Sequence, residues 1–199
     1  MPINEKSLIR QMRVNFKGAG YRVGTLMRGG VEWLMLNGMQ WAVALPYSEA
    51  GKDLKAQIVS HTGEMPGKPV KVQKDGVQLE MAGELEKTFA SVFTETSDMV
   101  PCRKTCLWLG EQLIWQDSSG RCSLFSPEMT DLIFPFDEDL LERMTDGRRM
   151  ILTDGEAKVF ALSRGAKDSQ QEMLDYLSCH NWADVVDEPE EDDGQEEIL

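Results

Sequence analysis

The side chains that could perform nucleophilic catalysis are few in this sequence. The chain has four cysteines and two histidines, His61 and His180. A catalytic thiol needs a base beside it, yet Cys179 and His180 are neighbours in a predicted helix, where consecutive side chains point about 100° apart. The pattern therefore predicts a non-catalytic protein. The alternative is an enzyme of unknown type. It requires Cys179, His180 or His61, or a pair of carboxylates, to find a catalytic partner elsewhere in the fold.

Metal binding is the second chemistry that the spacing suggests. Cys102 and Cys106 have three residues between them, which lies within the range seen for zinc ligands, and Cys122 or the pair 179–180 could complete a site. However, Cys106 falls within a predicted strand, and there is no second close pair of cysteines. Buried or incidental thiols are the favoured interpretation. Because the glycines also lack the spacing of a nucleotide-binding loop, we expect no metal and no cofactor.

The acidic residues are concentrated at the C-terminal end of the chain. The protein has 199 residues and a formal net charge of -13. Residues 184–199 contain nine acidic residues and no basic one, which predicts a disordered acidic tail. Its densest run consists of Glu190, Glu191, Asp192 and Asp193. Because such charge repels phosphate and attracts cations, we expect a protein partner with a basic surface, and direct nucleic-acid binding is disfavoured.

A basic stripe marks the opposite end of the chain. Residues 4–17 have the apolar spacing of a helix, with Asn4 as its N-cap and Gly18 as a left-handed C-terminal cap. The basic residues recur at steps of four, three and four, which places them on one helical face. They are Lys6, Arg10, Arg13 and Lys17. Two hypotheses stay open: a solvated face, or a docking surface for an acidic protein, for a phosphate backbone or for the protein's own tail.

Extended segments follow this helix. The pair 37–38, Asn-Gly, lies between two apolar runs and predicts a two-residue hairpin turn in which both residues have positive φ. In that register Trp33 lies opposite Ala42, and Trp41 lies on the other face of the sheet. Both faces are apolar around this turn, so they are either covered or available to a partner. Trp33 and Trp41 are therefore candidate interaction residues.

Strands outnumber helices and are joined by tight turns, with further hairpins expected at 75–76 and 154–155. We therefore predict an α+β fold, built from antiparallel hairpin sheets with four or five helices. The predicted elements form a repeat. The order helix, three strands, helix, two strands, helix occurs twice. Two organisations stay open: two similar lobes, 1–93 and 94–183, or one continuous domain, in either case followed by the tail 184–199.

This order of elements is similar to that of the small acidic chaperones of type III secretion, a resemblance of topology alone. It implies a chaperone or adaptor as an alternative function. The charge pattern favours a non-catalytic acidic interaction protein that engages a basic partner, in one form an anti-defence inhibitor that mimics nucleic acid. The sequence lacks a membrane-spanning run and a signal peptide, so we expect a cytoplasmic protein. The oligomeric state is not predicted.

Overall fold

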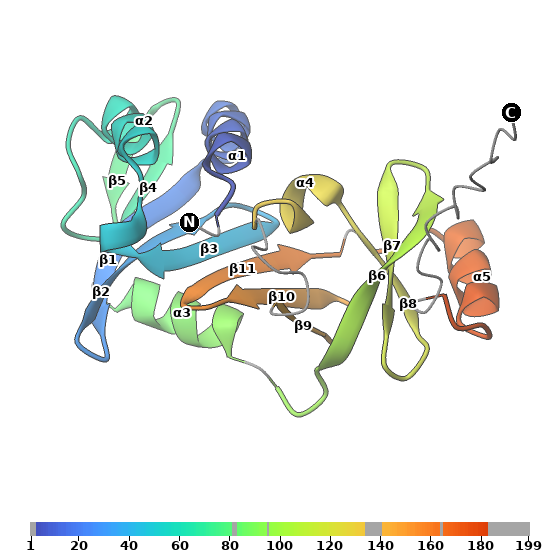
Figure 1. The fold of residues 1–199 in the computed structure, drawn as a ribbon. Helices are drawn as coiled ribbons and strands as arrows, with labels where there is room; N and C mark the ends of the chain where they lie inside the picture. Colours follow the sequence, from blue (N-terminus) through green and yellow to red (C-terminus); the bar gives the residue numbers. More distant parts are fainter. Residues whose placement is uncertain (1–2, 81–82, 95, 134–140, 164, 183–199) are drawn as a thin grey trace, which may run out of the picture.

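The computed structural model describes residues 3–80, 83–94, 96–133, 141–163 and 165–182 (Figure 1). Within these residues the helices are α1 (Glu5–Lys17), α2 (Lys52–Thr62), α3 (Glu84–Phe93), α4 (Pro127–Thr130) and α5 (Asp168–Leu177), with the short 3-10 helix η1 (Tyr47–Glu49). The strands are β1 (Tyr21–Arg28), β2 (Val31–Asn37), β3 (Trp41–Pro46), β4 (Val70–Gln73), β5 (Gly76–Leu79), β6 (Val100–Leu109), β7 (Gln112–Asp117), β8 (Cys122–Phe125), β9 (Glu142–Thr145), β10 (Arg149–Asp154) and β11 (Ala157–Leu162).

All the described strands belong to one antiparallel sheet. Their order is β5-β4-β1-β2-β3-β11-β10-β9-β6-β7-β8, which confirms the α+β class predicted from the hairpins. The two halves of the chain meet where β3 pairs with β11, with Val43 opposite Val159. Both candidate lobes thus contribute strands to one sheet, and their division at residue 93 stays a prediction.

Helices cover both faces of this sheet (Figure 1). On one face, α1 and α2 contribute the buried residues Leu8 and Ile58 to a large core that continues beneath α4. On the other face, α3 brings Phe93 into a second core, and α5 brings Leu174 into a third core over β7 and β8. Within the described residues, no helix has the length and apolar character needed to span a membrane.

Helix α1 begins as the sequence predicts but ends differently. The Asn4 side chain accepts a hydrogen bond from the Ser7 N–H at 3.2 Å, as expected of an N-cap. Gly18 has φ -113°, so the predicted left-handed cap is wrong. The positive φ falls instead on Gly20, at 82°, where a Cβ would lie 2.7 Å from the Val72 carbonyl oxygen. The close approach of β4 therefore requires a glycine two residues later than expected.

The hairpin between β2 and β3 has a different register from the predicted one. Asn37 pairs with Ala42 and Trp33 with Pro46, and neither residue of the 37–38 pair has a positive φ. A wider loop forms because the Trp41 ring packs against Gly38, where a Cβ would lie 2.4 Å from it. The shift is an even number of residues, so the predicted faces of both tryptophans are unchanged.

The remaining differences between prediction and structure concern two hairpins, strand β9 and the segment around Asp137. The hairpins expected at 75–76 and 154–155 form, but the ladders close at Gly76 and Ala157, so each two-residue turn lies one residue away from the predicted pair. Strand β9, which pairs with β10 and β6, was not predicted. Asp137, where the sequence predicts the start of a further short helix, lies outside the described residues.

Candidate functional site

The residues that could form a catalytic thiol and base are separated in the fold. His61 belongs to α2, whereas His180 follows α5, where its ring packs edge-on against Tyr176 and Trp182. The Cys179 thiol donates to the Asp175 carbonyl at 3.5 Å. No two of the three candidates His61, Cys179 and His180 face one another, so the arrangement among the described residues offers no thiol–imidazole pair.

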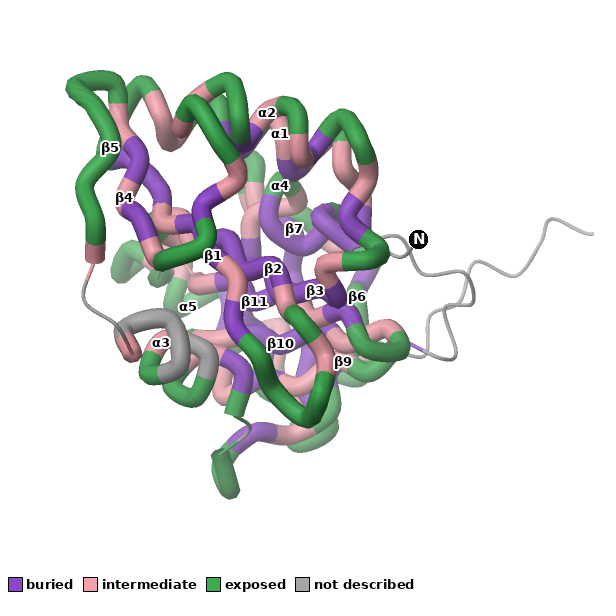
Figure 2. Tube along the Cα trace, turned by 90° about the vertical axis from the view of Figure 1, so that its left-hand side faces the viewer, coloured by how far each residue is buried: buried purple, intermediate pink, exposed green. Residues whose placement is uncertain are grey.

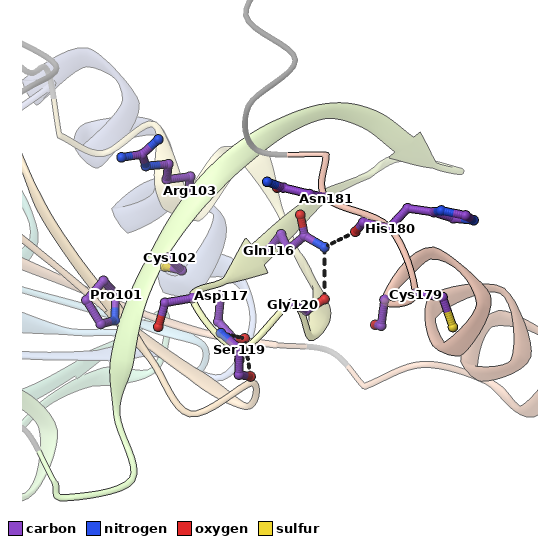
Figure 3. Close-up of a pocket in the computed structure, with 12 residues that line it drawn as sticks. Pro101, Cys102, Arg103, Gln116, Asp117, Ser119, Gly120, Cys179, His180 and Asn181 are labelled. Atoms are coloured by element: carbon purple, nitrogen blue, oxygen red, sulfur yellow. Dashed lines mark hydrogen bonds between the residues drawn. The ribbon is translucent and has the colours of Figure 1, made fainter.

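A cavity of about 510 Å³ nevertheless lies beside His180, between β6, the turn from β7 to β8 and the end of α5. It is lined by Cys102, Asp117 and Ser119 as well as by residues 178–181. Figure 3 shows the His180 ring and the Cys179 sulfur directed away from Cys102 and Asp117. Whether the cavity could support catalysis therefore depends on Asp117 and Cys102.

The Asp117 carboxylate accepts hydrogen bonds from residues of its own turn. Its Oδ1 accepts hydrogen bonds from the Ser119 N–H, the Ser119 hydroxyl and the Arg121 N–H, at 2.9, 2.6 and 3.0 Å. Its Oδ2 accepts from the Arg121 guanidinium at 3.0 Å. Four donors use the lone pairs that a general base would need, so Asp117 stabilises the turn.

Cys102 is not a nucleophile in this environment. Burial raises the pKa of its thiol to about 12, so the reactive thiolate is scarce at neutral pH. Cys102 and Cys106 both lie on β6, the first buried and the second exposed. Within the described residues, no group of three or more His, Cys, Asp or Glu side chains is placed to hold a metal ion, so the structure supplies no further ligands for the zinc hypothesis.

His61 lies instead at the centre of a polar cluster between α1, α2 and β1. The Arg13 guanidinium donates to Gln57 Oε1 at 2.8 Å, so the Gln57 amide nitrogen faces His61 Nε2, at 2.9 Å. Nε2 must therefore accept, and Nδ1 carries the proton toward the Tyr21 hydroxyl at 2.9 Å. The ring also stacks on Phe16 with its centroid 4.0 Å away. The contact with Gln57 follows helical spacing, but nothing in the sequence pointed to Tyr21.

This cluster predicts a loss of stability in mild acid. Burial, and then the positive charge of Arg13, lower the pKa of His61, and a second proton would place an Nε2–H against the Gln57 amide. Because the unfolded chain binds that proton first, we expect the free energy of unfolding to fall as the pH drops below the ordinary histidine value of about 6.5. Denaturant unfolding at a series of pH values measures this slope.

Two variants separate His61 from other groups that titrate. His61→Phe keeps a ring against Phe16 but cannot be protonated, so the slope between pH 7 and the carboxylate range should become flatter. His180→Gln removes the other histidine of the sequence and is the matched control. An equal slope in the intact chain and in His61→Phe would contradict the assignment.

The basic stripe of α1 is exposed, but its members differ. Arg10 pairs with Glu128 of α4 at 3.3 Å, whereas Arg13 reaches Gln57 of α2. No described acidic side chain forms an ion pair with Lys6 or Lys17. Two of the four cations therefore join α1 to its neighbouring helices, and both hypotheses for the stripe stay open.

The two candidate tryptophans are less accessible than an interaction residue should be. Trp41 is 1% exposed and belongs to the core beneath α1 and α2. Trp33 is half-buried and packs against the second core, beneath α3. Both apolar faces of the hairpin are therefore covered, and Trp41 presents almost no surface to a partner.

The charge of the protein is divided unevenly between the described fold and the rest of the chain. Of 21 basic and 34 acidic residues, the described ranges hold 20 and 21. Nine of the other acidic residues lie in 184–199, including Glu190, Glu191, Asp192 and Asp193, which are outside the described residues. The described ranges are thus nearly balanced in charge, and the excess negative charge belongs mainly to residues 184–199.

Comparison of the chain with protein-family models, with curated proteins and with solved structures finds no match.

Proposed function

We propose that this is a non-catalytic interaction protein whose acidic C-terminal segment, residues 184–199, engages the basic surface of another protein. The observation that carries the proposal is the division of charge, with 20 basic and 21 acidic residues in the described ranges and nine acidic residues without a base in the segment. An uncompensated charge of this density attracts a basic surface and accelerates encounter with it.

The reactive side chains of the described fold support a binding role. Asp117 is committed to its turn, burial raises the pKa of the Cys102 thiol, and His61 is held by Gln57 and Tyr21. Each of these groups has a structural role that accounts for its surroundings. A binding protein needs none of them to react.

One form of this function is an inhibitor that occupies a nucleic-acid groove. A segment of closely spaced carboxylates can take the place of a phosphate backbone against lysines and arginines. Because the described fold is nearly neutral, the mimicry would reside in residues 184–199 and not in the surface of the sheet. A chaperone would use the apolar faces of the hairpin between β2 and β3, and this alternative is less favoured because Trp41 is buried and Trp33 is packed against the second core.

The test begins with the protein that copurifies with the intact chain at low salt, with nucleic acid assayed in the same fractions. Replacing Glu190, Glu191, Asp192 and Asp193 by their amides should weaken binding of that protein by tenfold or more at low salt, because close-range charge attraction is lost. Binding of the intact chain should also fall steeply as salt is added. Titration calorimetry or biolayer interferometry measures both effects.

A matched control changes the same amount of charge elsewhere. The exposed acidic residues Glu64, Asp75, Glu111 and Glu156 belong to the described fold, and their amide variants should change affinity by no more than about twofold, as expected for rim charges. If this control weakens binding as much as the tail variant, net charge and not the segment is responsible. Binding that is insensitive to salt would overturn the proposal.

A further inference from the structure

The two edges of the sheet are protected differently. At one edge every residue of β8 is buried, and the Cys122 N–H donates to the Ser178 hydroxyl at 2.9 Å. At the other edge every residue of β5 is exposed (Figure 2). Natural proteins guard such an edge with charges, prolines or bulges, because it is a template for pairing with another chain. The sequence of β5, Gly-Val-Gln-Leu, contains no charge and no proline, and its ladder with β4 is regular.

The outward-facing hydrogen-bonding groups of β5 belong to Val77 and Leu79. The Glu80 N–H donates to the Pro69 carbonyl at 2.9 Å, so residue 80 forms a hydrogen-bonded pair at the end of this ladder. Hydrogen-bonded and non-hydrogen-bonded pairs alternate along antiparallel strands. The backbone of Gln78 therefore also bonds to β4, and the N–H and C=O groups of Val77 and Leu79 point away from the sheet.

The side chains of Val77 and Leu79 continue the apolar core beyond the helices α1 and α2 that cover it. Val77 lies opposite Val72, and Leu79 opposite Val70, and both partners are buried in the core beneath α1 and α2. Val77 is nevertheless 43% exposed and Leu79 77% exposed. The helix-covered face of the sheet thus continues to the free edge and ends there in uncovered apolar side chains.

We propose that β5 pairs antiparallel with β5 of a second copy of this chain, about a two-fold axis at Gln78. In this register Val77 lies opposite Leu79 of the second copy, and Leu79 opposite its Val77. Both pairs use the outward N–H and C=O groups, which gives four hydrogen bonds. Any other two-fold register leaves Val77 or Leu79 opposite the turn or beyond the end of the strand.

The chemistry of this edge favours an identical edge as its occupant. Self-pairing places no like charges opposite one another, because β5 is uncharged. Gln78 meets Gln78 of the second copy, whose amide can both donate and accept. Glu80, bound to Arg22 at 2.6 Å, lies opposite Gly76, which has no side chain to disturb that ion pair. The interface closes a two-fold dimer and cannot propagate.

The dimer should be weak and concentration-dependent. Two paired four-residue strands bury less than the roughly 1,000 Å² of a stable interface, which corresponds to a transient association. We therefore expect sedimentation velocity of the intact chain to show a monomer that converts to a dimer between micromolar and near-millimolar concentrations. Leu79→Lys should weaken the association at least tenfold, because it replaces the Val77–Leu79 contacts with charge. Met39→Lys, which changes an equally exposed methionine elsewhere, should leave it within about twofold.

Cross-linking tests the register. In a chain whose exposed cysteines Cys106 and Cys179 are replaced by serine, Gln78→Cys should form a covalent dimer under mild oxidation. The reason is that directly opposed non-hydrogen-bonded residues bring their Cα atoms within disulfide range. Asp75→Cys, on the turn of the same hairpin, should cross-link much more slowly.

Four results would overturn the proposal. Three are a chain that stays monomeric at every concentration, an unchanged association of Leu79→Lys, and equal cross-linking of the two cysteine variants. The fourth is the formation of assemblies larger than dimers, which would indicate pairing of β5 with β8 of another copy.

Discussion

Replacement of Trp41 by alanine is expected to lower the free energy of unfolding by about 3–5 kcal/mol, the usual cost of deleting a large buried aromatic side chain. Trp41 is 1% exposed, and its ring contacts the core that α1 and α2 cover. The deletion removes the buried apolar surface and leaves a cavity that the surrounding strands can only partly fill. Urea unfolding monitored by circular dichroism measures the change.

The other tryptophan of the same hairpin provides the control. Trp33 has the same volume but is only half-buried, so Trp33→Ala should cost about half as much or less. The comparison also tests the role expected from the sequence. If Trp41→Ala leaves stability unchanged while abolishing partner binding, Trp41 is an interaction residue after all and α1 does not cover it in solution.

The second large effect is expected at Asp117. Asp117→Ala should cost about 1–3 kcal/mol, because it removes the buried carboxylate that accepts from the backbone N–H groups of Ser119 and Arg121 in a turn whose other residues are partly exposed. The same loss should loosen the cavity wall beside residues 178–181. Thermal unfolding gives the stability change, and hydrogen exchange at the amides of 119–121 reports the turn directly.

Asp117→Asn separates the two parts of this effect. Asparagine keeps an Oδ1 acceptor for Ser119 and the Arg121 N–H but loses the charged pair with the Arg121 guanidinium, which is about half exposed. Because the Asp117 side of the pair is buried while Arg121 stays open to solvent, and the asparagine amide nitrogen would face the Arg121 donor, the asparagine variant should recover only part of the stability lost in the alanine variant. Equal losses in both variants would show that the charge, and not the acceptor geometry, stabilises the turn.

Local patterns in the sequence were sufficient for the start and the apolar face of α1 and for the class of the fold. The N-cap of Asn4 and the spacing of Leu8 and Met12 act within one helix, so no distant residue is needed to predict them. The register at 37–38 could not be predicted in this way. It depends on the burial of Trp41 and on the Asn15 side chain, which accepts the Met39 N–H at 3.3 Å, and both come from tertiary packing.

The candidate site shows the same limit. The basic stripe and the acidic segment are visible as spacing and composition, but the pairing of Arg10 with Glu128 joins residues 118 positions apart. Strand β9 gives no alternating pattern in four residues, Glu-Arg-Met-Thr, and is held by its pairing with β10 and β6. That β5 forms a free edge follows only from the strand order, which no local signal encodes.

The position of β11 has a consequence for synthesis of the chain. β11 is the last strand in the sequence, yet it lies between β3 and β10 in the middle of the sheet. This edge of β3 therefore remains unpaired until β11 is synthesised. β11 begins at residue 157, more than a hundred residues after β3 ends at Pro46. At 5–20 residues per second, a ribosome leaves this apolar edge without its neighbour for roughly 6–20 s. A nascent chain halted before β11 exposes at its centre the kind of unpaired edge that β5 has in the described fold.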